Sequence, residues 1–235
     1  MSKFDSRIGL LVREQEVMRM LSLFLNKSMD FIVVGGYAIS TYKKRFSIDL
    51  DIVIKEEDLK EFEKILGKEG YSLHYEKDIS LLYGENFKRF MKKIENLPVD
   101  IDLLINGLVS RTTDAAWGFD YIRRYSVKRK LDNSEFLTPE KELLIAMKFH
   151  SGRLSDIRDV VALMPCNEEK LRQHLLKGDI KKLRESMKKQ ESFLSKPQFD
   201  DSFKGIFGPH VYNEKDVQAA KELIREFLKT TQDKG

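Results

Sequence analysis

The chain has 235 residues, of which 41% are hydrophobic and 34% are charged, a balance typical of a folded globular protein and not of a disordered one. Its 42 Lys and Arg residues against 38 Asp and Glu give a net charge of +4, which permits an anionic partner such as a nucleotide or RNA without requiring one. Cys166 is the only cysteine, so no intrachain disulfide can form and a reducing cytoplasm is the expected location. No apolar run reaches about 18 residues, so no membrane span is expected.

The first half of the chain alternates between helical and strand-like patterns. Apolar residues at helical spacing predict amphipathic helices over 12–29 and 55–70. Short β-branched or apolar runs predict strands, or in the weaker cases a hairpin, at 31–34, 47–54, 72–76, 79–84 and 98–105. Two glycines follow the first of these runs, and a helix is expected to begin at them.

From residue 138 the pattern becomes helical. Thr138 and Pro139 suit a helix start, because Thr can cap a helix and Pro fits its first turn. Helices are expected over 138–152, 154–164, 167–178, 179–194 and 214–230. The intervening stretch 195–210 contains two prolines and two glycines, which predicts a loop.

The fold class predicted from this order is α/β (α+β), with a mixed sheet and flanking helices followed by an all-helical C-terminal region. Two domains are expected. The first, 1–137, would carry the N-terminal helix and the sheet, and the second, 138–235, would be helical.

Two of the apolar runs each carry a pair of aspartates. Asp49 and Asp51 interrupt IDLDIVI, and Asp100 and Asp102 interrupt VDIDLLI. Residues two apart on a strand face the same side, so each pair should lie side by side. A lone Asp in such a run usually lies at a strand end and faces solvent. Here, however, apolar residues occupy both the odd and the even positions of each run, which is not the pattern of an edge strand. Carboxylates gathered in a sheet repel unless a cation neutralises them, and oxygen-only ligands suit a hard divalent ion such as Mg²⁺.

A glycine pair and a basic turn precede the first aspartates. Gly35 and Gly36 lie between a strand and an expected helix start, where backbone N–H groups can approach a phosphate. Lys43, Lys44 and Arg45 follow, although a solvated loop is the alternative for the two lysines. Together with the paired acids, these features predict a site for a nucleotide and a metal ion.

At this point the residues resemble a known family. The stretch 33–54, VVGGYAISTYKKRFSIDLDIVI, looks like the nucleotidyltransferase signature of the DNA polymerase β superfamily: hydrophobic residues, Gly-Gly, a spacer, and Asp-x-Asp in a strand. The R-x-S-x-D-x-D form resembles the AbiEii-like branch of toxin and minimal nucleotidyltransferases, and it is matched by Arg45, Ser47, Asp49 and Asp51. The third carboxylate of the superfamily sits on a later strand. Asp100 and Asp102 both match it in type; the context of Asp102 fits better, and the duplication leaves the choice open.

The resemblance continues over TPEKELLIAMKFHSGRLSDIRDVVAL. That branch has a helix lysine followed by an Arg and a D-x-x-D pair, positions filled here by Lys148, Arg153, Asp156 and Asp159. Lys148 follows an apolar helical run, which favours a buried or cleft-facing role, whereas an ordinary charged helix with local ion pairs is the alternative. The likeness covers roughly residues 30–163 and does not extend to the C-terminal residues beyond them.

The resemblance implies an enzyme that depends on Mg²⁺ (or Mn²⁺) and transfers a nucleoside monophosphate from an NTP to an acceptor hydroxyl. The metal ligands would be Asp49, Asp51 and Asp102, with Asp100 as the alternative. Asp102 could also accept the proton of the acceptor, and Lys148 would act beside these acids. The nucleotide-binding residues would be Gly35, Gly36, Ser40, Arg45, Ser47, Lys148, Asp156 and Asp159.

The branch further implies a toxin-type enzyme that acts on tRNA and is controlled by a cognate antitoxin. The basic segments 123–130 and 181–189 could follow an RNA backbone, or they could be solvated faces. The alternatives are transfer to a small molecule or a protein side chain, and a non-catalytic nucleotide-binding module. A Rossmann dehydrogenase is excluded because G-x-G-x-x-G is missing. His150 is expected to pack in its helix and not to take part in catalysis.

Overall fold

The computed structural model describes residues 3–78 and 86–231, and the chain divides into two compact units. One unit, called here the sheet unit, comprises Met1–Thr41, Phe46–Leu108 and Trp117–Pro139. The other, the helical unit, comprises Tyr42–Arg45, Val109–Ala116 and Glu140–Gly235. The expected division into domains 1–137 and 138–235 stays a prediction.

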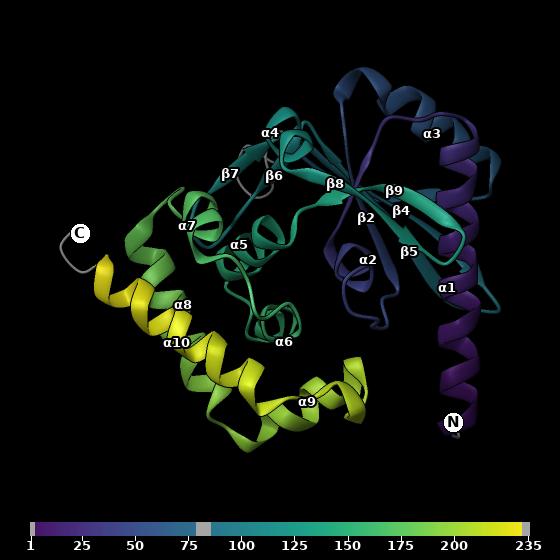
Figure 1. Ribbon diagram of the computed structural model, residues 1–235. Coiled ribbons are helices and arrows are strands. Elements are labelled where there is room, and N and C mark those ends of the chain that lie inside the picture. The colour runs from purple at the N-terminus through teal and green to yellow at the C-terminus, as the bar shows by residue number, and fades with distance from the viewer. Residues whose placement is uncertain (1–2, 79–85, 232–235) are drawn as a thin grey trace. The chain divides into compact units, whose positions relative to one another are not determined.

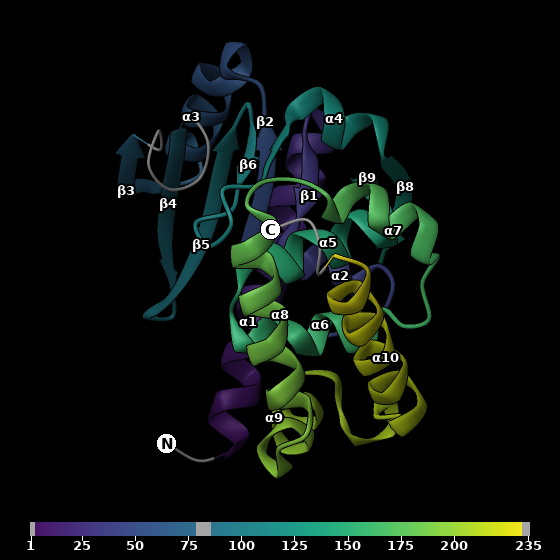
Figure 2. The same cartoon turned by 90° about the vertical axis from the view of Figure 1, so that its left-hand side faces the viewer.

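The sheet unit, which Figure 1 shows with α1 and α3, is built on a five-stranded mixed sheet with the strand order β1-β2-β5-β4-β3, which can be followed in Figure 2. Its strands are β1 (Ile32–Val34), β2 (Asp49–Ile54), β3 (Ser72–Asp78), β4 (Asn86–Ile94) and β5 (Leu97–Ile105). β2 and β5 pair in parallel, and the other neighbours pair antiparallel. The two strands that carry the aspartates, β2 and β5, therefore lie in the interior of the sheet. This agrees with the prediction from the apolar residues at both odd and even positions of each run.

Two helices, α1 (Lys3–Asn26) and α3 (Leu59–Lys68), pack against one face of this sheet. The strand residues in that core alternate along the two central strands and are Leu50, Ile52, Ile54, Val99, Ile101, Leu103 and Ile105. Facing them are the helix residues Val17, Met20, Leu21, Phe24, Phe62, Ile65 and Leu66. Because side chains alternate along a strand, the aspartates of β2 and β5 are turned to the opposite face of the sheet.

The remaining elements of the sheet unit are short. They are α2 (Gly35–Ser40), η1 (Glu56–Asp58), α4 (Phe119–Arg124), β8 (Ser126–Leu131) and β9 (Ser134–Pro139), and the last two form an antiparallel hairpin. A further two-stranded ribbon consists of β6 (Gly107–Val109) and β7 (Ala116–Gly118). The weak strand prediction at 79–84 lies outside the described residues.

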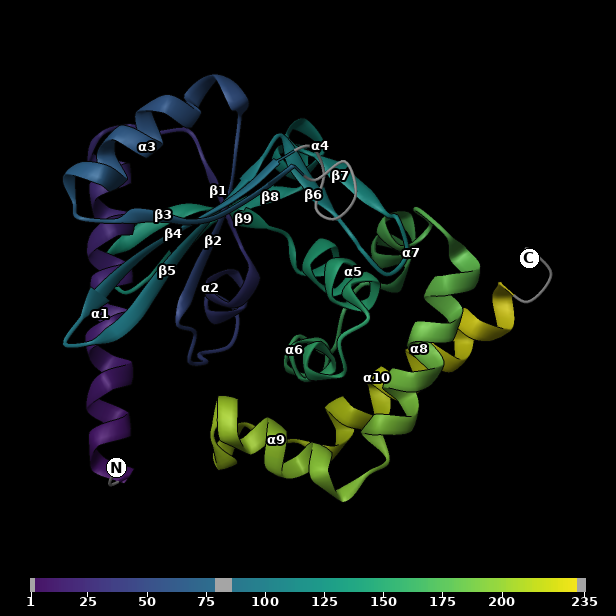
Figure 3. The same cartoon turned by 180° about the vertical axis from the view of Figure 1, so that it is seen from behind.

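Among its described residues, the helical unit contains the five helices expected from residue 138 onward, one more α-helix and two short 3₁₀ helices. They are α5 (Lys141–Ser151), η2 (Leu154–Asp156), α6 (Ile157–Ala162), α7 (Glu168–Leu175), α8 (Ile180–Leu194), α9 (Pro197–Phe207), η3 (Pro209–Val211) and α10 (Glu214–Thr230). Figure 3 shows α8 and α10 side by side, and the two helices are in contact. The predicted α/β fold class, a mixed sheet with flanking helices followed by a helical C-terminal region, is confirmed.

The loop predicted over 195–210 is wrong, because most of it forms α9. Pro197 occupies the first turn of this helix, where its missing N–H costs nothing. Phe199, Phe203 and Phe207 are spaced by four residues and are all buried, so one apolar face stabilises the helix. Gly205 lies within the helix instead of ending it.

Several predicted boundaries also shift. The first helix begins well before residue 12 and ends at Asn26. Thr138 and Pro139 end β9 and do not begin a helix, and α5 starts at Lys141 after Glu140. The helix predicted at 154–164 divides into η2 and α6. Within the described ranges, no helix combines the length and the hydropathy that a membrane span requires.

Candidate functional site

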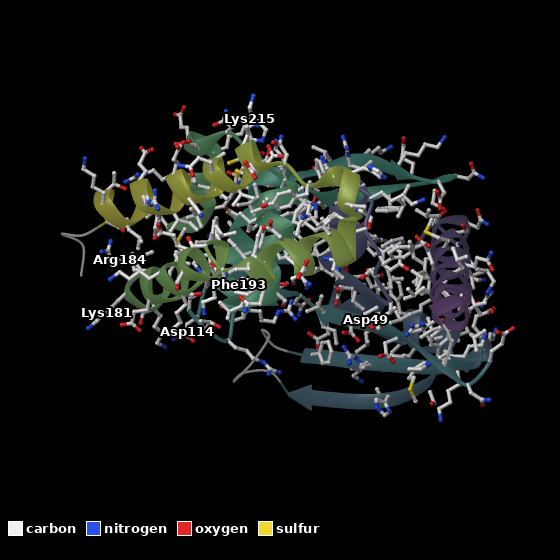
Figure 4. The ribbon with its side chains drawn as sticks, turned by 90° about the horizontal axis from the view of Figure 1, so that it is seen from below. Asp49, Asp114, Lys181, Arg184, Phe193 and Lys215 are labelled. Atoms are coloured by element: carbon white, nitrogen blue, oxygen red, sulfur yellow. The ribbon has the colours of Figure 1, made fainter. Side chains whose placement is uncertain are left out.

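The two aspartate pairs meet in the register of β2 and β5. Asp49 pairs with Asp100, and Asp51 pairs with Asp102. Because paired residues on adjacent strands point to the same side, all four carboxylates lie on the sheet face opposite α1 and α3. Neighbouring strands run about 4.8 Å apart, so these acids are immediate neighbours. Asp49 is labelled in Figure 4. The four residues Asp49, Asp51, Asp100 and Asp102 are together called the aspartate face below.

Arg89, which the sequence reading missed, holds the most buried of these acids. Arg89 lies on β4 directly opposite Asp102. Its guanidinium donates from Nε to Oδ1 of Asp102 at 2.7 Å and from Nη2 to Oδ2 at 2.6 Å. Its Nη1 lies 3.9 Å from Oδ2 of Asp100. The arginine was missed because no strand was predicted at 86–94; the signal available there was the mixture of aromatic and basic residues in FKRFMKK.

The carboxylates influence one another electrostatically. Burial raises the pKa of Asp102; Arg89 opposes this shift, and the negative charges of Asp49 and Asp100 add to it. Arg89 in turn has a raised pKa, mainly because of its hydrogen bonds to Asp102. The net shift of the Asp102 pKa is upward, while the two hydrogen bonds from Arg89 favour the ionised carboxylate.

The glycine pair lies against the aspartate face. α2 begins at Gly35, as expected, and Gly35 has a positive φ of 63°. A Cβ built on Gly35 would lie 1.9 Å from Oδ2 of Asp51, so only glycine leaves room for this carboxylate. Gly36 is buried, and its carbonyl accepts a hydrogen bond from the hydroxyl of Ser40 at 3.0 Å.

The segment that leads into β2 is tied to α2. The hydroxyl of the buried Tyr37 donates to the carbonyl oxygen of Ser47 at 3.1 Å. Burial raises the pKa of Tyr37, and the negative charges of Glu14 and Asp49 add to the shift. Ser47 therefore positions the start of the aspartate-bearing strand through its backbone.

The other predicted site residues meet in the helical unit. Lys148 of α5 is only 8% exposed, and its Nζ lies 2.7 Å from Oδ2 of Asp159 and 3.3 Å from Oδ1 of Asp156. Arg45 donates to the other oxygen of Asp159 at 2.5 Å. Arg153 binds Asp156 at 2.9 Å, and the hydroxyl of Ser151 donates to the same oxygen at 2.6 Å. These contacts join two buried acids to three cations, of which Lys148 is buried and Arg153 is exposed, and this set is called here the buried ion cluster.

The charges in this cluster stabilise each other. Burial lowers the pKa of Lys148, but Asp159 and Asp156 raise it by more, so the net shift is upward. Burial raises the pKa of Asp156, whereas Lys148 and Arg153 lower it, and the net shift is downward. Both residues are therefore charged near neutral pH. Arg158 points elsewhere and donates to the hydroxyl of Ser202 at 2.9 Å.

His150 packs in the helical unit, as expected. Its side chain is fully buried, with Nδ1 lying 2.6 Å from the hydroxyl of Thr113 and Nε2 lying 3.1 Å from the carbonyl oxygen of Leu175. Burial lowers its pKa to about 4, so the imidazole is neutral at physiological pH.

The chemistry of the aspartate face suits a divalent ion. Its donors are carboxylate oxygens only, the ligand type that Mg²⁺ and Mn²⁺ prefer. Oδ1 of Asp100 is buried and accepts no hydrogen bond from any described residue. In residues 3–78 and 86–231, no three acids, histidines or cysteines are already arranged as a metal site. The predicted roles of the individual residues stay predictions.

The two basic segments differ in structure. Segment 123–130 covers the end of α4 and most of β8, and segment 181–189 lies within α8. Lys181 is exposed, whereas Arg184 donates to the carbonyl oxygen of Leu228 and, at 2.6 Å, to the hydroxyl of Thr231 (Lys181 and Arg184 are labelled in Figure 4). Arg184 is therefore held within the fold, whereas the four lysines of α8 are exposed.

No family model and no curated protein matches this chain. Among solved structures, it is similar to the lincosamide antibiotic adenylyltransferase LnuA in its lincomycin-bound form, with 14% identity, a TM-score of 0.46, and coverage of 68% of this chain and 97% of that one. It is also similar to the antibiotic-resistance factor ANT(2'')-Ia, with 13% identity, a TM-score of 0.44, and coverage of 95% and 96%.

A third similar structure is an antigenic nucleotidyltransferase-like protein from Paracoccidioides brasiliensis. The identity is 12%, the TM-score is 0.46, and the match covers 82% of this chain and 92% of that one. At these identities and TM-scores, the likenesses establish neither a family nor an activity for this chain.

Proposed function

We propose that the protein is a metal-dependent nucleotidyltransferase of the DNA polymerase β superfamily that transfers a nucleoside monophosphate from an NTP to an acceptor hydroxyl. The observation that carries this proposal is the register of β2 and β5, which aligns Asp49 and Asp51 with Asp100 and Asp102 on one sheet face. The contact of Gly35 with the carboxylate of Asp51 supports it, because it brings the glycine turn to these acids.

In this reaction the acceptor oxygen forms a bond to the α-phosphorus, the bond from that phosphorus to the bridging oxygen breaks, and pyrophosphate leaves. Asp49, Asp51 and Asp102 would hold divalent Mg²⁺ or Mn²⁺, and Asp100 is the alternative third ligand. When bound, the metal would supply positive charge to the phosphates and make the acceptor hydroxyl easier to deprotonate. Asp102 accepts the proton that the acceptor loses.

The remaining roles concern the triphosphate. The backbone N–H groups at Gly35 and Gly36 would face the phosphates, and Ser40 and Ser47 hold this turn through their hydrogen bonds with Gly36 and Tyr37. Lys148 and Arg45 contribute positive charge, and Asp156 and Asp159 orient Lys148. The distances of 2.7 and 3.3 Å from Lys148 to these two acids support a positioning role.

For the acceptor, we propose tRNA and a toxin-type enzyme of the AbiEii-like branch that works in the cytoplasm and is restrained by an antitoxin protein. The resemblance of Arg45, Ser47, Asp49 and Asp51 to R-x-S-x-D-x-D supports the branch. The net charge of +4 and the exposed Lys181 are compatible with RNA. A small hydroxylated molecule or a protein side chain is the alternative acceptor, and a non-catalytic nucleotide-binding module is the alternative function.

The deciding experiment incubates the protein with each of the four NTPs, labelled in turn at the α- and γ-phosphate, with Mg²⁺ or Mn²⁺ and with total tRNA. We expect α-label on RNA and none from the γ-position. Label on the protein in a control without RNA would move the acceptor to a side chain. Absence of label everywhere would favour the binding module.

The matched variants are Asp51→Asn and Asp120→Asn. Asp120 is an exposed acid in the first turn of α4 and is not part of the aspartate face. Asp51→Asn should lose nearly all transfer, and Asp120→Asn should keep it. Wild-type transfer by Asp51→Asn with all four NTPs would refute the assignment.

A further inference from the structure

Arg89 occupies the position at which a cation would be expected beside Asp102. Both oxygens of Asp102 accept an N–H from the same guanidinium, at 2.7 and 2.6 Å. The side chain of Asp102 is only 4% exposed, whereas that of Arg89 is 33% exposed. The buried acid is therefore covered by a cation that itself reaches the surface.

The same guanidinium also faces the rest of the aspartate face. Its Nη1 lies 3.9 Å from Oδ2 of Asp100, and it interacts electrostatically with Asp49. Its Cζ lies 5.9 Å from the ring centroid of Phe87, two residues earlier on the same strand face. This guanidinium therefore acts on several carboxylates of the aspartate face and not on Asp102 alone.

A metal ion and this guanidinium cannot both bind Asp102 without cost. A divalent ion at an oxygen of Asp102 would lie within a few ångströms of a positive charge, and repulsion at that distance is strong away from bulk water. Each N–H that Arg89 donates also occupies one of the roughly four lone-pair sites of the carboxylate, so fewer of them are open to a metal ion.

We infer that Arg89 is an internal counter-cation that holds Asp102 in the metal-free protein and competes with the divalent ion for it, so that Arg89 sets the metal affinity of the site. The inference rests on the proposed function, because that proposal makes Asp102 a metal ligand. Arg89 is accordingly a positioning residue: it keeps the acids together before metal binds and releases Asp102 when metal arrives.

The test measures Mn²⁺ binding without nucleotide, by titration calorimetry, for the wild type, Arg89→Met and Lys92→Met. Lys92 lies on the same strand but pairs with Glu16 of α1 at 3.1 Å, on the other sheet face. Its substitution removes the same charge without touching Asp102. We expect Arg89→Met to bind Mn²⁺ roughly tenfold more tightly and Lys92→Met to stay within about twofold of the wild type.

Two results would overturn the inference. Arg89→Met could bind Mn²⁺ no more tightly than the wild type, or Lys92→Met could gain as much affinity as Arg89→Met, which would make the effect one of net charge alone. If Arg89→Met does not fold, Arg89→Lys replaces it. This variant keeps the charge but loses the forked contact, and it should bind Mn²⁺ more tightly than the wild type.

A direct readout comes from the side-chain Nε–H signal of Arg89 in ¹⁵N NMR. The signal should be protected from exchange in the metal-free wild type and should lose that protection at saturating Mg²⁺. An unchanged signal would contradict the release of Asp102.

Titration of Asp51→Asn separates this inference from the proposed function. If Asp51→Asn binds Mn²⁺ as tightly as the wild type, the aspartate face is not the metal site and both proposals fail. If Asp51→Asn binds more weakly but Arg89→Met binds no more tightly, only the competition is refuted.

Discussion

Gly35 and Asp51 touch at a point where no side chain would fit on residue 35. The Cβ position of Gly35 lies 1.9 Å from Oδ2 of Asp51, and the φ of Gly35 is +63°. Glycine is therefore required at position 35 for two reasons: the backbone there is left-handed, and a side chain would collide with the carboxylate of Asp51. The glycine turn and the aspartate face are a single structural unit for this reason.

Gly35→Ala should lower the free energy of unfolding by about 2 kcal/mol, because Ala disfavours positive φ and its methyl group displaces Asp51. Metal binding should weaken with it. Gly67→Ala is the matched control, since Gly67 lies in α3 with nothing within 4 Å of its Cβ position. The free energy of unfolding of Gly67→Ala should rise by about 0.5–1 kcal/mol, because Ala favours a helix more than Gly does. Urea unfolding measures both, and equal effects of the two substitutions would contradict the role of the contact.

Removing one acid from the aspartate face should stabilise the metal-free protein. Asp51→Asn reduces the repulsion among the four carboxylates of the aspartate face, and we expect the free energy of unfolding to rise by about 1 kcal/mol in the presence of EDTA. Asp120→Asn, which changes an exposed acid, should be neutral or slightly destabilising. Thermal unfolding in EDTA tests this, and a clear loss of stability in Asp51→Asn would speak against carboxylate repulsion.

The buried ion cluster should be sensitive to Asp159. Asp159→Asn leaves both Lys148 and Arg45 without their shared carboxylate, and removing one partner from a buried ion pair costs about 3 kcal/mol. Asp201→Asn is the control, because Asp201 is an exposed acid on α9 of the same unit. Chemical denaturation compares the two, and a cost below about 1 kcal/mol for Asp159→Asn would mean that the cluster is screened by solvent.

Stability should fall as the pH is lowered from about 7 to 5, because of His150. Burial, with Lys177 adding to it, lowers its pKa from 6.5 to about 4 in the folded protein. Between these values the unfolded chain binds the proton and the folded protein does not, so acid favours unfolding. The linkage predicts a loss of about 2 kcal/mol by pH 5.

His150→Gln should flatten this pH dependence, although its stability at neutral pH will be lower. His210→Gln, at an exposed position of the same unit, should keep the wild-type slope. Urea unfolding at half-unit pH steps gives both slopes. The same slope in His150→Gln as in the wild type would assign the effect to other groups.

Local patterns in the chain were enough to identify the acids and the turn. Asp49 and Asp51 are two residues apart on one strand, so their spacing alone predicted that both side chains point to the same face of the sheet. The glycines at the end of a β-branched run placed the start of α2 correctly. The same local reasoning failed at 195–210, because proline and glycine content predicted a loop, whereas Phe199, Phe203 and Phe207 bury an apolar face and stabilise a helix.

Long-range pairing supplied everything that joins these segments. Asp51 could pair with Asp102 or with a residue two positions away, and the choice depends on how two strands about fifty residues apart are aligned. Both alignments keep the aspartates on the same face of the sheet, so the spacing within one strand does not distinguish them. The position of Arg89 beside Asp102 requires the neighbouring β4, and Arg45 reaches Asp159 from more than one hundred positions away. Strand register and side-chain packing depend on contacts between segments distant in the chain, and a single sequence carries no direct record of them.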